Sequence, residues 1–205
     1  MTKISAIFCD VGGVLGTNGW GRAERRRAAE TFKLDRKDFE GRHELVVDAF
    51  EAGKISLDQY LDHTVFCCPR AFRREEFVSF MKLQSQPFPA ALVLFEKLAS
   101  TRQYFLATLN NESLDLNFHR IEAFGLKKYF SLFLSSCFLG LKKPDPAIFQ
   151  MALRLTQREP EECLFIDDRA LNVEAARRGG FSAVQCLDPG KLEQQVREVG
   201  IELQK

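Results

Sequence analysis

The feature that most constrains the fold is an alternation of short apolar runs with longer helical patterns. Four runs rich in β-branched or aromatic residues each lead to a polar residue: ISAIFC at 4–9 before Asp10, YFLA at 104–107 before Thr108, LFLSS at 132–136 with its two serines, and CLFI at 163–166 before Asp167. Such runs are typical of strands buried on both faces. Helical patterns follow them at 90–100, 114–124, 146–155 and 172–178. This alternation predicts an α/β fold with a Rossmann-like, doubly wound parallel sheet.

One segment, 17–85, breaks the alternation. It contains no convincing strand and consists of charged amphipathic stretches such as GRAERRRAAETF and DFEGRHELVVDAFEAG. Pro87 and Pro89 mark the return to the sheet, because proline resists continuing a helix. We therefore expect a core made of 1–16 and 86–205, interrupted by a small all-α cap at 17–85.

The composition argues against several classes of partner. The 29 basic and 28 acidic residues leave a formal net charge of +1, so no global field favours nucleic acid or an anionic membrane. The first apolar run is too short for a signal-peptide core or a membrane span. Six scattered cysteines show no C-x-x-C spacing, which disfavours a zinc site. We expect a cytoplasmic protein that binds neither nucleic acid nor membrane.

Polar residues collect where the predicted strands end. Asp10, Thr108 and the pair Asp167 and Asp168 each follow a predicted strand, and Lys143 lies in the loop GLKKPDP after another. Ligands of open parallel sheets bind outside the carboxyl ends of the strands, so these side chains should converge. Any one of them alone would be explained as a helix cap or a turn former. Their occurrence together, in order, predicts a functional site.

These residue types suit phosphoryl transfer. Asp10 and Asp168 offer the hard oxygen ligands that Mg²⁺ prefers, and Gly12 and Gly13 let the backbone approach a metal and a phosphate. A free oxygen of Asp10 would attack phosphorus and form an aspartyl-phosphate. Lys143 would neutralise the charge of the nucleophile and the phosphate, and Thr108 would donate a hydrogen bond to a phosphoryl oxygen. Asn110 and Asn111 follow Thr108 in a loop at the mouth of the crevice and are expected to contact the substrate.

Four motifs, FCDVGGVL, FLATLNN, GLKKPDPAIF and LFIDDRALNVEAARRGG, resemble those of the haloacid dehalogenase superfamily across essentially the whole chain. The helical insert resembles the small cap of one subgroup, particularly its sugar-phosphate phosphatases. The resemblance implies a Mg²⁺-dependent hydrolase of a small phosphorylated substrate. It implies these residues: Asp10 as nucleophile, Thr108 and Lys143 on the phosphate, the metal ligands Asp10, Asp168 and the Gly12 carbonyl, Asp167 behind those ligands, and Asn172 as a support of the loop.

Gly12 departs from the family pattern. Family phosphatases commonly carry there a second Asp that protonates the leaving oxygen, a contribution of about 10²- to 10⁴-fold for a general acid. Three readings remain open. The first is a phosphatase for substrates whose leaving group needs little protonation, such as an anomeric sugar phosphate or an acyl phosphate. The second is a 2-haloacid dehalogenase using the same Asp10. The third is a weakly active protein that binds a phosphorylated ligand.

Residues of the insert are weaker site candidates. Trp20 is expected to be a packing anchor and His43 to lie on a solvated or helix-packing face, although both are positioned to close over a substrate. The arginines near 22–27 alternate with glutamates, which is typical of solvated helix faces with ion pairs. The tail at 191–205 predicts an amphipathic helix with a break at Gly200. That helix suits packing on the sheet or a dimer contact, so both a monomer and a homodimer remain open.

Overall fold

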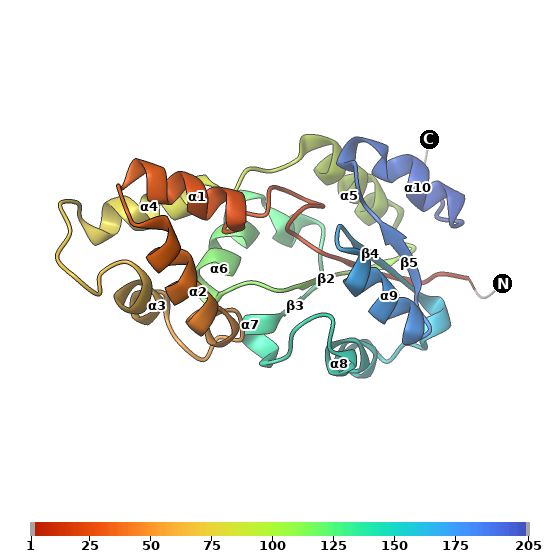
Figure 1. Ribbon diagram of the computed structural model, residues 1–205. Coiled ribbons are helices and arrows are strands. Elements are labelled where there is room, and N and C mark those ends of the chain that lie inside the picture. Colours follow the sequence, from red (N-terminus) through yellow and green to blue (C-terminus); the bar gives the residue numbers. More distant parts are fainter. Residues whose placement is uncertain (1–2, 204–205) are drawn as a thin grey trace.

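The computed structural model describes residues 3–203 and contains a five-stranded, all-parallel sheet in the order β3-β2-β1-β4-β5 (Figure 1). Residues 1–2 and 204–205, which belong to the predicted core, lie outside the described residues. The α/β class and the doubly wound parallel sheet are confirmed. The strands are β1 (Ala6–Cys9), β2 (Phe105–Asn110), β3 (Leu132–Ser135), β4 (Cys163–Asp167) and β5 (Ser182–Gln185).

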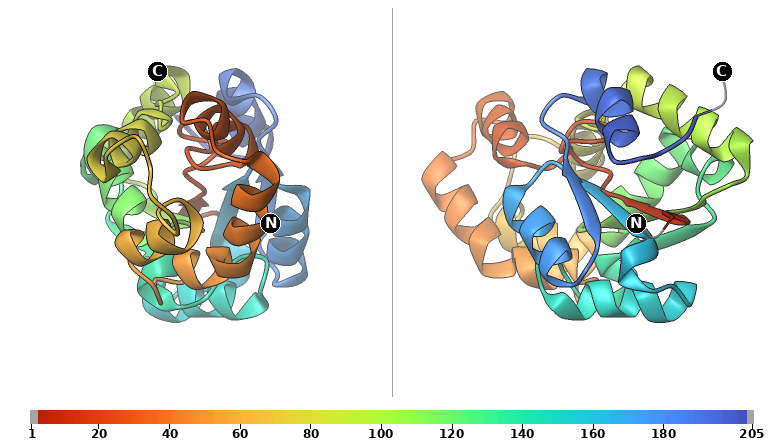
Figure 2. Two further views of the ribbon diagram at one scale, coloured as in Figure 1. Left: turned by 60° about the vertical axis from the view of Figure 1, so that its left-hand side comes forward. Right: turned by 90° about the vertical axis from the view of Figure 1, so that its right-hand side faces the viewer.

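Helices cover both faces of the sheet. Figure 2 (right) shows α5 (Pro89–Thr101) and α10 (Leu192–Glu198) on one side, and α8 (Pro146–Thr156) and α9 (Ala170–Arg178) on the other. Along β1, Ile7 and Cys9 pack into the first layer, whereas Ala6 and Phe8 pack into the second. All four are fully buried, which explains why the strand is an uninterrupted apolar run.

The sheet differs from the predicted one most clearly at β2 and β5. β2 continues to Asn110, so the prediction that Thr108 follows the strand is wrong: Thr108 pairs with Cys9 inside the sheet. β5 was not predicted, because its four residues, SAVQ, form a short edge strand with only Val184 buried. The remaining elements of the core are α6 (Leu114–Ala123), the short α7 (Ser136–Leu139) and three 3₁₀ turns, η1 (Leu126–Lys128), η2 (Pro160–Glu162) and η3 (Pro189–Lys191).

The segment between β1 and β2 is helical, as predicted. It forms α1 (Arg22–Thr31), α2 (Arg36–Glu51), α3 (Leu57–Thr64) and α4 (Arg74–Leu83), which lie together beyond the carboxyl ends of the strands (Figure 1). These helices bury an apolar cluster of their own, to which the core adds Leu116 of α6. Aromatic rings dominate it, with Trp20 edge-on to Phe39 and Phe77 at centroid separations of 6.4 and 5.8 Å.

The two connections between the core and the inserted helices run side by side. Thr17 N–H donates to the Gln86 carbonyl at 2.8 Å, and the Thr17 hydroxyl donates to the Gln84 carbonyl at 2.6 Å. Phe88 N–H donates to the Leu15 carbonyl at 2.8 Å. The two segments that connect the inserted helices to the core, 15–17 and 84–88, are therefore held together by hydrogen bonds. The division into a core and a cap at 16/17 and 85/86 stays a prediction.

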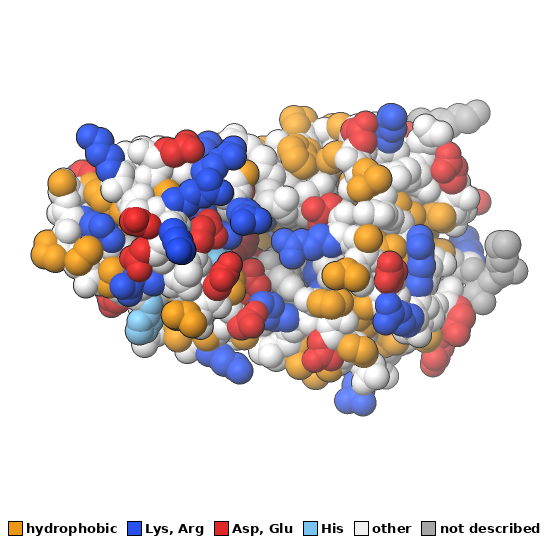
Figure 3. All heavy atoms as spheres, viewed as in Figure 1, with side chains coloured by type: hydrophobic (Ala, Val, Ile, Leu, Met, Phe, Trp, Pro, Cys, Tyr) orange, Lys and Arg blue, Asp and Glu red, His pale blue; other side chains and the backbone are white. Residues whose placement is uncertain are grey.

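The face in Figure 3 is hollowed between the inserted helices and the sheet, and Lys and Arg side chains there are interspersed with Asp and Glu. The ion pairs Arg26–Glu30 and Arg27–Glu24 lie on α1, in keeping with the expected charged helix face. Within residues 3–203, none of the helices has the length and apolar character needed to cross a membrane.

Candidate active site

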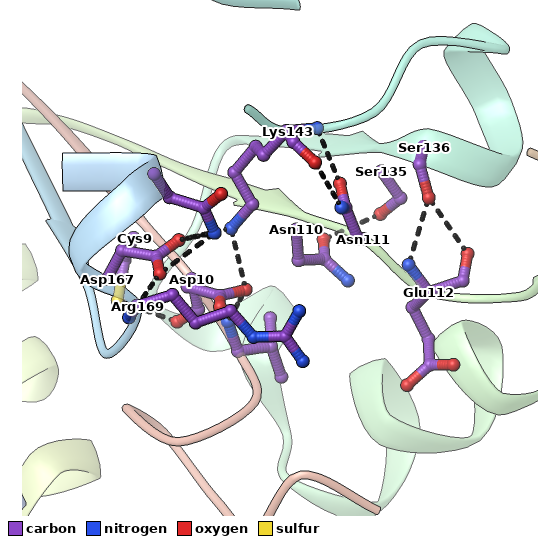
Figure 4. A network of polar contacts seen from close by, with 12 residues as sticks. Cys9, Asp10, Asn110, Asn111, Glu112, Ser135, Ser136, Lys143, Asp167 and Arg169 are labelled. Carbon is purple, nitrogen blue, oxygen red and sulfur yellow. Dashed lines mark hydrogen bonds and ion pairs between the residues drawn. The ribbon is translucent and has the colours of Figure 1, made fainter. Parts of the chain in front are cut away.

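The centre of the site is a buried lysine between two aspartates. Asp10 directly follows β1 and Asp167 ends β4, and because these strands are neighbours in a parallel sheet, their ends lie together. Lys143 reaches in from the loop after α7, with Nζ 3.1 Å from Asp10 Oδ1 and 2.6 Å from Asp167 Oδ2 (Figure 4). All three side chains are nearly inaccessible to solvent, so the interaction between these charges is weakly screened.

The electrostatics of this group show an excess of negative charge. Burial raises the pKa of Asp10 to about 7, since the loss of hydration outweighs the attraction of Lys143, and Asp167 and Asp168 act in the same direction. Burial opposes the charge of Lys143, but Asp10 and Asp167 outweigh it and raise the pKa of the ammonium group. Asp10 and Asp167 therefore share a single buried ammonium, and Asp168 adds a third carboxylate close to them.

Asp167 and Asp168 are neighbours in sequence but differ in environment. Asp167 accepts hydrogen bonds from Asn172 Nδ2 at 3.0 Å and from the Arg169 N–H at 2.8 Å, in addition to Lys143. Asp168 Oδ1 is buried and has no hydrogen-bond partner among residues 3–203. A Cβ at Gly13 would overlap the Asp168 carboxylate, so the absence of a side chain at position 13 leaves room for that carboxylate. Both oxygens of Asp167 accept hydrogen bonds, whereas Oδ1 of Asp168 accepts none from the described residues.

Asn111 fixes the loop that carries Lys143. Its side-chain amide donates to the Lys143 carbonyl at 2.8 Å and accepts from the Lys143 N–H at 2.9 Å. Asn110 is turned into a separate buried network, where it accepts from the Ser135 hydroxyl at 2.9 Å (Figure 4) and donates to Asn117 Oδ1 at 3.1 Å. Of the two asparagines expected to contact a substrate, only Asn111 lines the cavity described next.

A cavity of about 300 Å³ opens between the strand ends and the inserted helices. The core contributes to its floor, and α1 and α2 with the loop before them contribute to its walls. The floor includes Asp10, Gly12, Asn111, Lys143, Arg169 and Asn172. The walls include Trp20, Arg22, Arg25, His43, Val47, Phe50 and Glu51. Thr108 does not line the cavity: it is fully buried, and its hydroxyl has no partner among the described residues.

Of two charged residues at the cavity wall, Glu112 follows Asn111 in the loop expected to contact the substrate, whereas Arg120 was not singled out from the sequence. Arg120 and Glu112 form an ion pair at 3.4 Å (Nε to Oε2), with side chains 3% and 9% exposed. Burial raises the pKa of Glu112, against the attraction of Arg120. Helical spacing could have pointed to Arg120, because the buried side of α6 consists of Leu116, Asn117, Arg120 and Ile121. Charged residues on such a side need a partner or a ligand.

Trp20 and His43 are buried, and both also line the cavity. The indole N–H of Trp20 donates to the Tyr60 hydroxyl at 2.9 Å, and that hydroxyl lies 2.9 Å from His43 Nδ1. Burial and the positive charges of Arg25 and Lys142 lower the pKa of His43 to about 4. His43 is therefore neutral at neutral pH and is a poor replacement for the acid missing at Gly12.

Two curated relatives show similar sequences. The chain is 26% identical over 227 residues to bifunctional epoxide hydrolase 2 of Sus scrofa, a match covering 99% of this chain and 40% of the relative. It is 28% identical over 122 residues to phosphoglycolate phosphatase of Aquifex aeolicus, covering 56% of this chain and 57% of the relative. The match therefore spans well under two thirds of either relative.

Solved structures share the fold. A haloacid dehalogenase family enzyme from Bacteroides thetaiotaomicron, in complex with magnesium and inorganic phosphate, superposes with a TM-score of 0.76 at 21% identity, covering 89% of this chain and 93% of that one. An L-2-haloacid dehalogenase gives a TM-score of 0.63 at 21% identity, covering 89% and 84%. Since phosphate-bound and dehalogenating proteins share this fold, the fold alone does not choose between the two chemistries.

The sequence model of the haloacid dehalogenase-like hydrolases matches residues 4–180, which include both strands that carry the acidic cluster and all the inserted helices. With that match and the parallel sheet whose ends hold Asp10, Lys143, Asp167 and Asp168, the chain belongs to the haloacid dehalogenase-like hydrolases.

Proposed function

We propose that this protein is a Mg²⁺-dependent phosphatase that hydrolyses a small phosphorylated metabolite, such as a sugar phosphate, through an aspartyl-phosphate. The observation that carries the proposal is the group of Asp10, Asp167 and Asp168, in which one carboxylate oxygen of each lies within 4.8 Å of the others and the Lys143 ammonium pairs with Asp10 and Asp167. Three negative charges and one positive charge in a buried site favour a divalent cation. A phosphate-transferring enzyme uses such a cation, together with a lysine, to neutralise its substrate.

The residues fit the metal. Oδ1 of Asp168, which has no partner among the described residues, is a hard oxygen ligand. Asp10 is contacted by Lys143 and by the Val11 N–H, and both contacts are to Oδ1. Oδ2 of Asp10 therefore has no donor among the described residues. We assign Asp10, Asp168 and the Gly12 carbonyl as ligands, with Asp167 holding Lys143 behind them. When bound, Mg²⁺ supplies charge neutralisation and orients the phosphoryl oxygens.

The side chains then have distinct roles in the reaction. Asp10 attacks phosphorus with one carboxylate oxygen, leaving the other for the metal, the P–O bond to the leaving group breaks, and its electron pair stays on the leaving oxygen. Lys143 neutralises the phosphoryl charge, and Asn111 fixes the Lys143 loop by its paired hydrogen bonds. A water molecule next attacks phosphorus of the aspartyl-phosphate, which releases inorganic phosphate and restores the Asp10 carboxylate.

The first test is phosphate release from p-nitrophenyl phosphate and a panel of sugar phosphates, with Mg²⁺ and with chelator. We expect release that the chelator abolishes, and we expect Asp10→Asn to lower kcat by at least about 10³-fold, since it removes the nucleophile. Asp115→Asn at the exposed first turn of α6 is the matched control and should retain activity.

Halide release from a 2-haloacid is measured in parallel with phosphate release. Chelator-resistant halide release without phosphate release would assign the protein to the dehalogenases instead. A folded protein that binds inorganic phosphate but turns over neither kind of substrate would be a phospho-ligand-binding protein. Full activity of Asp10→Asn would show that another group attacks phosphorus.

A further inference from the structure

Two glycines in the loop after β1 make room for the guanidinium of Arg120. Gly19 has a φ of +69°, and a Cβ there would overlap Nη2 of Arg120 and lie 3.0 Å from Nε. A Cβ at Gly12 would lie 3.4 Å from Nη1. The guanidinium therefore lies against the backbone of this loop, beside the position where family phosphatases commonly carry a second Asp.

The protein holds Arg120 in place by two of its three nitrogens. Nε donates to the Ser85 hydroxyl at 3.2 Å and faces Glu112 at 3.4 Å, and Nη2 donates to the Thr17 carbonyl at 3.0 Å. Nη1 makes no hydrogen bond to any residue in the range 3–203, although Arg120 is only 2% exposed. A buried cation with an unused donor group that lines a cavity is suited to an anionic or electron-rich ligand atom.

The unused nitrogen is placed for the leaving group of the proposed reaction. Asp10 lies on the floor of the same cavity, two residues before Gly12. In-line displacement directs the leaving oxygen to the side of phosphorus opposite Asp10. That side faces the open cavity, which Gly12 and Arg120 both line and where His43 is neutral. Negative charge develops on the leaving oxygen as the P–O bond breaks, so a fixed guanidinium there favours the transition state.

We propose that Arg120, through Nη1, donates a hydrogen bond to the leaving oxygen and takes the place of the general acid that is missing at Gly12. This inference rests on the phosphatase function proposed above. The leaving oxygen keeps the electron pair of the broken P–O bond, is held by the guanidinium, and takes its proton from water after departure. Because no protein group protonates it, the preferred substrates are those whose leaving oxygen is a weak base, such as acyl phosphates or anomeric sugar phosphates.

The test measures how kcat/KM depends on the leaving group in a series of aryl phosphates with Mg²⁺. Arg120→Gln is made together with Glu112→Gln, so that no unpaired carboxylate stays buried, and Glu112→Gln alone is the matched control. We expect the double variant to lose about 10²-fold in kcat/KM for unsubstituted phenyl phosphate, as for one lost oxyanion donor, but only a few-fold for dinitrophenyl phosphate. The control should keep the wild-type dependence.

Each other outcome contradicts the inference in a recognisable way. An equal loss for all leaving groups would assign Arg120 a purely structural role while leaving the phosphatase function intact. A steeper dependence in Glu112→Gln alone would make Glu112 the proton donor. If the folded wild-type protein releases phosphate from no aryl, acyl or sugar phosphate, the proposed function fails together with the inference.

Gly12→Asp is a second test, because it adds a carboxylate that competes with the leaving oxygen for Arg120. The new carboxylate would lie within reach of Nη1, pair with Arg120 and withdraw it from the leaving oxygen. We expect kcat/KM for phenyl phosphate to fall, while Gly12→Ala, which adds only a Cβ, controls for the loss of space. A rise for poor leaving groups in Gly12→Asp would mean that a carboxylic acid works beside Arg120, and the inference would be wrong.

Discussion

At the residue scale, the hydrogen bonds around Tyr60 favour one tautomer of His43. Trp20 Nε1 is only a donor, so the Tyr60 hydroxyl accepts from it, and we assign the hydroxyl proton to His43 Nδ1, which lies 2.9 Å away. The proton of the neutral imidazole is then on Nε2. His43 lines the cavity, and we infer that it offers a substrate a neutral N–H donor and not an acid.

This environment makes the stability of the protein depend on pH. The pKa of His43 is about 4 in the folded protein and about 6.5 when unfolded, so the unfolded chain binds more protons between these values. The free energy of unfolding should therefore rise with pH from 4 to 6.5, with His43 contributing up to about 3 kcal/mol. Urea unfolding at several pH values should show a weaker rise in His43→Gln than in the control His63→Gln, made at an exposed position. An unchanged pH dependence in His43→Gln would contradict the assigned neutral state.

At the element scale, the end of α2 is attached to α7 by close backbone contact. Gly53, just after α2, has a φ of +68°, and a Cβ there would overlap the Cys137 carbonyl oxygen. Beside it, the Ser136 hydroxyl donates to the Glu51 carbonyl at 2.6 Å, and Lys142 Nζ lies 2.6 Å from Glu51 Oε2. These contacts hold the cavity-lining end of α2 over the strand ends.

Replacing two glycines of this region by alanine should change the free energy of unfolding in opposite directions. Gly53→Ala should lower the free energy of unfolding by about 1–3 kcal/mol, because it adds left-handed strain and an overlap. Gly41→Ala, inside α2 with no atom within 4 Å of the new Cβ, should raise it by about 0.5–1 kcal/mol through helix propensity. Urea midpoints compare the two. Equal effects would mean that the contact between α2 and α7 does not constrain the fold.

At the scale of the whole molecule, a nearly neutral chain concentrates negative charge at one site. The net charge is +1, yet Asp10, Asp167 and Asp168 lie together with a single buried ammonium among them and the first two of them paired to it, and burial together with Asp167 raises the pKa of Asp168. A bound cation would offset this repulsion, and a ligand that binds only the folded state stabilises it. The acidic site is thus expected to cost stability until Mg²⁺ binds.

Thermal unfolding with and without Mg²⁺ tests this expectation. At a Mg²⁺ concentration of 100 times Kd, the stabilisation should be about 2.7 kcal/mol, or roughly 5–10 °C in Tm for a chain of this size. Asp168→Asn should lose most of this shift, and its Tm without metal should equal or exceed that of the wild type, because one of three like charges is removed. A Mg²⁺ shift that survives in Asp168→Asn would remove Asp168 from the ligands.

The sequence by itself determined the parallel α/β class, the helical character of the inserted segment and the position of the acidic residues at strand ends. These follow from local patterns, because a strand buried on both faces must be apolar along its length and an amphipathic helix shows its period within a few turns. Weak local signals failed. β5 is short and half exposed, and β2 runs three residues further than its apolar run because Asn110 finds partners in Asn117 and Ser135.

Only the tertiary structure decided which side chains meet across the cavity. Arg120 donates to the carbonyl of Thr17, which is 103 positions away in the sequence, and Lys143 pairs with Asp167, which is 24 positions away. Likewise, His43 owes its neutral form to burial and to the charges of Arg25 and Lys142, which lie on α1 and in the loop after α7. No local pattern encodes such pairs, because a buried charge is stabilised by whichever partner the packing brings to it, and packing is a property of the whole chain.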